Sequence, residues 1–87
     1  PGGVDPIKAR INALYKRRPS TPWSQKEQSS YRRAQIAEED LQIVERARQL
    51  GYLYYRKDIF TLLNNWNAEV DRSRAFILDE SDYKHPN

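Results

Sequence analysis

Apolar residues recur along this 87-residue chain at spacings of three, four and seven residues, and no segment alternates apolar and polar residues for long. Recurrence at those spacings marks one face of an α-helix, whereas strict alternation would mark a strand. The pattern therefore predicts an all-α fold, arranged as a small orthogonal bundle of about four helices. A chain of this length fits one small domain, and we expect that domain to span residues 6–78.

The first predicted helix begins after Asp5, a good N-cap residue, with Pro6 at the first helical position. It should end before Pro19, because a residue that precedes a proline is disfavoured in helical geometry. The apolar residues of this segment fall on one face and predict its buried side: Ile7, Ile11, Leu14 and Tyr15.

The second predicted helix has two possible starts. Thr21 followed by Pro22 repeats the pattern of a cap and a proline, whereas Ser24 with Glu27 would form a capping box. The helix should end near Ala34. Because it is short and polar, its stability must come from packing against the rest of the domain.

The third predicted helix begins with three acidic residues and ends before Gly51. Acidic side chains are favourable at a helix N-terminus because the helix dipole is positive there. Glycine readily adopts the left-handed conformation that commonly follows a helix. Consecutive residues point in different directions on a helix, so we expect no metal site at the triplet Glu38, Glu39 and Asp40.

The longest predicted helix lies within the segment YYRKDIFTLLNNWNAEVDRSR, residues 54–74, and continues to about residue 77. Its apolar stripe consists of Ile59, Leu62, Leu63, Trp66 and Val70. Trp66 lies within the stripe, so we expect it to be buried in the core. Asparagine is a poor helix former, and the asparagines at positions 64, 65 and 67 either cap or bridge to a neighbouring backbone or contact a ligand.

The two ends of the chain are predicted to lie outside the helical domain. Residues 1–5, PGGVD, are typical of a linker. The chain contains no methionine, which fits either a trimmed initiator methionine or a domain of a larger protein, and the linker-like start favours the second. Residues 79–87 are polar, and we expect a disordered tail there.

The composition excludes several classes of function. Without cysteine the chain has neither disulfides nor a thiolate metal site, and this absence fits a reducing compartment. No apolar run approaches the ~20 residues that span a bilayer, and no secretory signal is visible, so we expect a cytoplasmic protein. The only histidine is His85, and the three glycines form no phosphate-binding loop. We therefore expect no enzyme, catalytic residue, metal or cofactor.

Positive charge is concentrated in the first part of the chain. Residues 6–35 carry eight basic side chains and one acidic one, for a net charge of +7, whereas residues 36–87 carry a net charge of −3. Such asymmetry predicts a positive face that meets nucleic acid or an acidic protein surface. The alternative is an ordinary pair of solvated helices.

The candidate nucleic-acid-binding residues combine these cations with a tyrosine beside two further cations, because single-strand binders place ring faces next to positive charge. They are Arg10, Lys16, Arg17, Arg18, Arg32, Arg33, Tyr55, Arg56 and Lys57. Tyrosines at such a position also commonly serve in packing. We expect Arg17 and Arg18 to be dispensable for folding, because the apolar stripe of the first helix does not include them.

The stretches ALYKRRPSTPWSQKE, AEEDLQIVER and YYRKDIFTLLNNWNAEVDRSR resemble the C-terminal part of phage and prophage replication-type proteins. In those proteins a winged-helix or helix-turn-helix domain precedes a short helical region. The segment LLNNW, residues 62–66, is also similar to the end of the DnaD C-terminal motif, Tyr-x-x-x-Ile-Leu-x-x-Trp. The motif's tyrosine falls at position 58, where this chain has Asp58, and Tyr55 lies one turn earlier. The DnaD family is helical, acts in primosome assembly and helicase loading, and contacts DNA, often single-stranded, through its C-terminal module.

The charge pattern and the resemblance predict an accessory helical domain of a phage or prophage replication protein. It would bind DNA through a basic face, with single-stranded DNA favoured, and would have neither a membrane nor a small molecule as a partner. One alternative is a protein-docking module for a replicative helicase or a partner subunit, favoured by the charge-separated third helix and the acidic tail. The other is a self-association domain, in which Phe60 and Phe76 lie outside the main apolar stripe and bury against a second copy.

Overall fold

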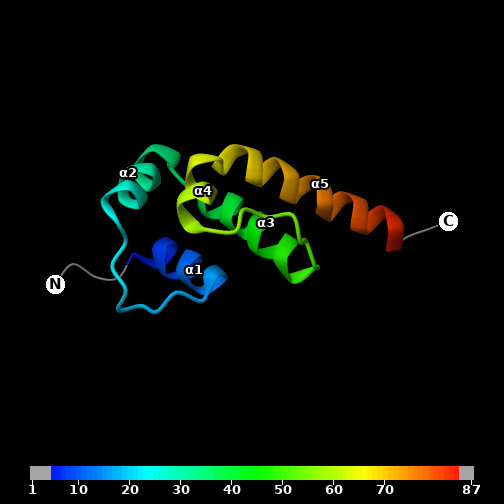
Figure 1. Cartoon of the computed structure of the whole chain (residues 1–87). Helices are drawn as coiled ribbons and strands as arrows, with labels where there is room; N and C mark the ends of the chain where they lie inside the picture. The colour runs from blue at the N-terminus through cyan, green and yellow to red at the C-terminus, as the bar shows by residue number, and fades with distance from the viewer. Residues whose placement is uncertain (1–4, 85–87) are drawn as a thin grey trace.

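A computed structural model of the chain describes residues 5–84, with side chains from residue 5 to residue 80. Within that range the chain forms five α-helices and no strand (Figure 1), which confirms the predicted all-α class. The helices are α1 (Pro6–Tyr15), α2 (Gln25–Ala34), α3 (Glu38–Gln49), α4 (Ile59–Asn64) and α5 (Trp66–Lys84). Residues 1–4 of the predicted linker and residues 85–87 of the predicted tail lie outside the described residues.

The length of helix α1 is set by a side-chain cap at Asp5 and a left-handed residue at Lys16. The Asp5 carboxylate accepts hydrogen bonds from two backbone N–H groups of the first turn, at 2.9 and 3.4 Å. At the other end Lys16 adopts the left-handed conformation, with a φ angle of 56°. The helix therefore ends at Tyr15, two residues before the last position that Pro19 would allow, because the backbone has already turned at Lys16.

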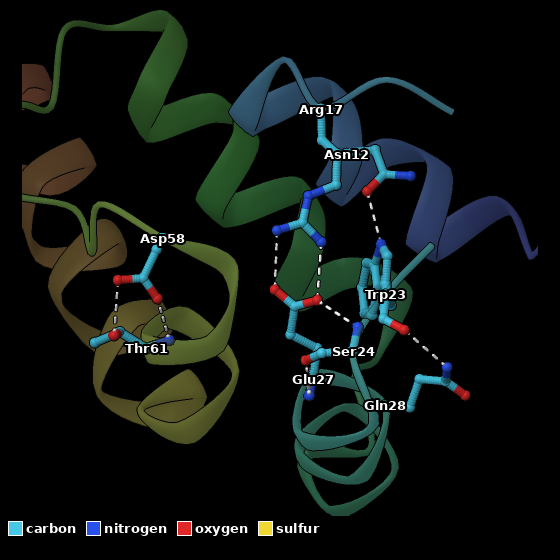
Figure 2. Close-up of polar contacts among 8 residues, drawn as sticks. All are labelled: Asn12, Arg17, Trp23, Ser24, Glu27, Gln28, Asp58 and Thr61. Carbon is cyan, nitrogen blue, oxygen red and sulfur yellow. Dashed lines mark hydrogen bonds and ion pairs between the residues drawn. The ribbon is translucent and has the colours of Figure 1, made fainter. Parts of the chain in front are cut away.

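Helices α2 and α3 follow the local signals in their sequence. The Ser24 hydroxyl accepts the N–H of Glu27 at 3.1 Å, and the Glu27 carboxylate accepts the N–H of Ser24 at 2.8 Å (Figure 2). This full capping box means that the start at Ser24 is the one that forms. Helix α2 ends at Ala34 as predicted, and α3 ends two residues before Gly51, whose φ angle of 98° favours glycine.

The longest predicted helix is in fact two helices, which raises the number from about four to five. Helix α4 ends at Asn64, Asn65 departs from helical geometry with φ −123° and ψ 32°, and α5 begins at Trp66. Asparagine has a low helix propensity, and both asparagine side chains are engaged elsewhere. The Asn64 amide oxygen accepts a hydrogen bond from the Ser30 hydroxyl of α2 at 2.7 Å, and the Asn65 amide donates to the Thr61 carbonyl at 2.9 Å.

Helix α5 extends farther than the sequence pattern predicts. It runs to Lys84, so the segment expected to be disordered from residue 79 is helical as far as residue 84. Once a helix has formed, adding one more residue costs only the conformational entropy of that residue and gains one backbone hydrogen bond. No residue between Trp66 and Lys84 is a proline or a glycine, and the polarity of the segment does not by itself end a helix.

Four helix pairs build the domain: α1 packs on α3, α2 packs on α4, α5 packs along α3, and α4 contacts α5. Figure 1 shows the second half of α5 extending past the end of α3. Trp66 is 3% exposed, as its place in the apolar stripe predicts. The core cluster between the helices consists of Ile11, Trp23, Leu41, Val44, Ile59, Leu62, Leu63, Trp66 and Val70.

Candidate nucleic-acid interface

Arg17 and Glu27 form a bidentate ion pair that links the residues after α1 to the start of α2 (Figure 2). The Arg17 Nη1 and Nη2 atoms lie 2.9 Å from the Glu27 Oε1 and Oε2 atoms. Glu27 is 8% exposed, and hydrogen bonds from Arg17 lower the pKa of its carboxyl group. The charge of Arg17 is therefore neutralised inside the protein, although the sequence pattern placed it on a free basic face.

We expect the Arg17→Ala substitution to destabilise the domain by about 1–3 kcal/mol, because it leaves the buried Glu27 carboxylate without its charged donor. This expectation replaces the view from the sequence that Arg17 is dispensable for folding. Urea denaturation followed by circular dichroism measures the free energy of unfolding. Arg18→Ala is the matched control, since Arg18 is exposed and its removal should change that free energy by less than ~0.5 kcal/mol.

The stability lost in Arg17→Ala should also depend on pH. The Glu27 pKa lies below its ordinary value of 4.5 in the folded protein. A carboxyl group with a lowered folded pKa stabilises the fold above its unfolded pKa, and this contribution is lost as the pH falls through the folded pKa. The difference from wild type should be full at about pH 7 and should shrink below about pH 4. A difference of equal size at both pH values would contradict the ion-pair explanation.

Arg10, a second predicted contact residue, is also engaged within the protein. Its guanidinium group lies 2.6 Å from Glu38 and 2.6 Å from Glu45, both on α3. The hydrogen bond from Arg10 to Glu38 lowers the pKa of that carboxyl group. This pairing holds α1 against α3. Because the charge of Arg10 is already compensated by the two glutamates, it is not available to bind a polyanion.

A buried carboxylate holds Arg56, the third paired arginine of the predicted set. Glu69 of α5 is fully buried, and its Oε1 atom lies 3.3 Å from the Arg56 Nη1 atom. The Arg48 Nη2 atom approaches the other carboxylate oxygen to 4.0 Å. Tyr15 donates its hydroxyl hydrogen to the Arg56 carbonyl at 2.6 Å. This cluster fixes the segment between α3 and α4 to the body of the domain.

Tyr55 packs within the protein rather than offering a free ring face. The Arg48 guanidinium carbon lies 3.6 Å from the centre of the Tyr55 ring, and the Lys57 ammonium group lies 4.0 Å from it. Lys57 also donates a hydrogen bond to the Leu53 carbonyl at 2.7 Å. The geometry of Tyr55 and Lys57 therefore favours a role in packing over a role in stacking on a base.

Besides Lys57, which is exposed in the segment between α3 and α4, the exposed cations of the predicted set fall into two groups. Lys16 and Arg18 lie in the connection between α1 and α2, whereas Arg32 and Arg33 lie at the end of α2. Because Arg10, Arg17 and Arg56 are paired with glutamates, the structure does not give the predicted residues as one set of free cations. Lys26, which the candidate list omits, is exposed on α2 and adds a third cation to the second group.

Two of the α2 cations, Lys26 and Arg33, border two adjoining hollows, which we call the α2–α4 groove. The hollows have volumes of about 300 and 360 Å³ and share Ser30 and Arg33 as a common wall. The groove is lined by Lys26, Ser30, Arg33, Phe60, Asn64, Asn65 and Asn67, among others. None of the described residues that line either hollow is acidic.

Arg33 is held in the groove by neutral partners only. Its Nη2 atom donates to the Ser30 hydroxyl at 3.2 Å and to the Asn64 amide oxygen at 3.4 Å. These hydrogen bonds position the guanidinium group without neutralising its charge. Within residues 5–80, no carboxylate lies within ion-pair distance of Arg33.

Phe60 and the start of α5 complete the groove. The Phe60 side chain is 38% exposed at the hollow that Lys26 and Arg33 also line. The other hollow lies against the first turn of α5, whose first backbone hydrogen bond is donated by Glu69 to Asn65 at 2.9 Å. Backbone N–H groups before that bond have no intrahelical acceptor, so the helix end adds partial positive charge to this part of the groove.

The sequence pattern contained a partial signal for this groove. Phe60 lies outside the apolar stripe, and the cluster of asparagines lowers helix propensity where a helix was expected. Neither feature identified α2 as the neighbour, because the contact between α2 and α4 joins residues more than thirty positions apart, such as Ser30 and Asn64.

No family model, curated protein or solved structure matches this chain, so the likeness to replication proteins remains an expectation from the sequence. No helix in the described part of the chain is long and apolar enough to cross a membrane. Among the same residues, no group of three or more histidine, cysteine, aspartate or glutamate side chains could hold a metal ion. The candidate interface is therefore defined by the chemistry of its own residues on an all-α helical bundle.

Proposed function

We propose that this domain binds single-stranded DNA without base specificity through the α2–α4 groove. The cations of α2 contact the phosphate backbone, a base stacks on the Phe60 ring, and the amides of Asn64 and Asn67 hydrogen-bond to bases or sugars. The setting that we propose is the one that the resemblance implies, an accessory domain of a phage or prophage replication protein.

The uncompensated charge of α2 is the observation that carries this proposal. Lys26, Arg32 and Arg33 are exposed and have no carboxylate partner within residues 5–80, whereas Arg10 and Arg17 are paired with glutamates. Lys26 and Arg33 line a groove without acidic lining and Arg32 lies on the same helix, and uncompensated cations so placed attract a polyanion. The exposed ring favours a single strand over a duplex, because only unstacked bases offer a face for stacking.

The double substitution Lys26→Ala/Arg33→Ala should weaken binding to single-stranded oligonucleotides of any sequence. Two lost phosphate contacts should reduce the slope of log affinity against log salt by about 1.4 units. Fluorescence anisotropy at several salt concentrations measures both quantities. The matched control is Arg18→Ala/Arg46→Ala, which removes two exposed cations outside the groove and should leave the slope nearly unchanged.

Phe60→Ala tests the stacking contact separately from the charge. Loss of one stacked base should weaken binding by about 1–3 kcal/mol, with the salt slope unchanged because no cation is removed. If removing the control pair reduces the salt slope and removing the groove pair does not, the interface includes Arg18 or Arg46 and the groove is not the binding site. If the wild-type domain binds no oligonucleotide tighter than ~100 μM at low salt, the DNA proposal fails as a whole.

A second candidate function, docking of a protein, is favoured by a different observation. The side chains of Leu53 and Tyr54 are 70% and 82% exposed, and neither lines the α2–α4 groove. Large exposed side chains of this kind are typical of contact surfaces between proteins.

A further inference from the structure

A second surface lies where α5 passes the segment that follows α3. A hollow of about 470 Å³ is lined there by Tyr52, Tyr54, Arg72, Ala75, Phe76 and Asp79. Tyr54 is the most exposed of the aromatic side chains that line this hollow. The lining thus combines aromatic rings with one cation and one carboxylate, all on a single face.

The segment that presents Tyr54 is fixed on both sides. Tyr52 is 6% exposed and packs against Phe76, with the ring centres 5.3 Å apart. On the other side Arg56 is paired with the buried Glu69. Because Tyr54 is held between two anchored residues, a partner that contacts it loses little affinity to the ordering of the segment.

The exposed face of α5 carries a charge pattern that is complementary to itself. Arg72 and Asp79 are seven residues apart, which is nearly two helical turns, so they share a face about 10 Å apart along the axis. Both are exposed, and their charges are opposite. Ala75 and Phe76 lie between them, a small side chain next to a large one, and the midpoint of the pattern falls between these two residues.

We propose that a second copy of this chain docks on this surface through antiparallel pairing of the two α5 helices. A two-fold axis through the midpoint places Arg72 of each copy opposite Asp79 of the other. The same axis places Phe76 of each copy over Ala75 of the other, so that a large side chain meets a small one. Every contact occurs twice, as an interface between identical surfaces requires, and the charge complementarity selects a second copy as the partner.

This arrangement differs from the self-association that the sequence alone suggested. Phe60 lines the α2–α4 groove and Phe76 lines the hollow on α5, so only Phe76 belongs to the proposed dimer interface. The two proposed surfaces share no lining residue. DNA binding and dimer formation can therefore be tested independently.

Sedimentation equilibrium measures the association directly. Between ~10 μM and ~1 mM, the range for a small and weak interface, the average mass should rise towards twice that of the monomer. Arg72→Asp places like charges opposite each other at both symmetry-related pairs and should raise the dimer Kd about 10-fold. Asp79→Arg should do the same. The double variant Arg72→Asp/Asp79→Arg restores opposite charges across the axis and should return the Kd to within about 3-fold of wild type.

The rescue by the double variant distinguishes a dimer from an effect within one chain. Arg72 and Asp79 are too far apart along one helix to pair with each other, so only a second copy can restore the contact. Arg18→Asp, with the same charge change at an exposed position outside the interface, should leave the Kd unchanged, and circular dichroism should show the same helix content in every variant. Any one of three results would overturn the proposal. The wild-type domain could stay monomeric at ~1 mM, the single charge reversals could associate as tightly as wild type, or the double variant could associate as weakly as the single variants.

Discussion

The Trp66→Ala substitution is expected to lower the free energy of unfolding by about 3–5 kcal/mol, the usual loss when a large core side chain is truncated. Trp66 is 3% exposed and packs in one cluster with Leu62, Leu63 and Val70. Small domains have a total stability of only about 5–15 kcal/mol, so this variant should unfold at a much lower urea concentration than wild type. Urea denaturation followed by circular dichroism measures the change.

Two further substitutions separate the packing of Trp66 from other effects. The Trp66 indole N–H is buried without a hydrogen-bond acceptor in the described structure, so Trp66→Phe removes an unsatisfied donor and should cost less than half as much as Trp66→Ala. Tyr54→Ala removes a ring that is 82% exposed and should change the stability by less than ~0.5 kcal/mol. A Trp66→Ala variant as stable as Tyr54→Ala would show that Trp66 does not support the core.

The Glu69→Ala substitution is expected to destabilise the domain by a similar amount, about 3–5 kcal/mol, because it leaves two arginines without their counter-charge. The side chains of Arg48 and Arg56 are only 10% and 17% exposed, and both approach the Glu69 carboxylate. Glu69→Gln should fall between wild type and Glu69→Ala, since the amide can still accept a hydrogen bond from Arg56. Thermal and urea denaturation both measure the loss.

Asp71→Ala is the matched control for Glu69, because it removes a carboxylate from the same helix. The Asp71 side chain is 77% exposed, and its ion pair with Arg74 spans 3.8 Å at the surface. Exposed pairs of this kind contribute about 0–1 kcal/mol. Equal stability of Glu69→Ala and Asp71→Ala would contradict the view that the buried carboxylate holds the segment between α3 and α4 in place.

The two proposed surfaces use different parts of α5. The α2–α4 groove includes residues 66–68 at the start of the helix, and the proposed dimer interface uses residues 72–79. A dimer would therefore present two grooves. Binding of one strand to both grooves would be tighter than binding to either, because the second contact forms within the complex at a high effective concentration.

The start of α1 and the ends of α2 and α3 were predicted, and the start of α2 was narrowed to two residues, because short-range signals determine them; the left-handed turn at Lys16 that ends α1 was not predicted. Asp5, Ser24 with Glu27, and Gly51 act on backbone groups within a few residues of themselves. The break at Asn65 was missed because the apolar stripe continues through it, and a stripe indicates which face is buried without indicating whether the helix is continuous. The hydrogen bond from Ser30 to Asn64 depends on how α2 packs on α4, which no local pattern describes.

The sequence by itself determined the all-α class, the buried face of each segment and the excess of positive charge in the first part of the chain. Only the tertiary structure decided which of those charges are free. Arg10 and Arg17 are neutralised by Glu45 and Glu27, whereas Arg33 meets only neutral partners. The physical reason is distance: a charge is compensated by whichever carboxylate lies within a few ångströms of it, and the packing of the helices brings together residues as far apart in the chain as Arg10 and Glu45.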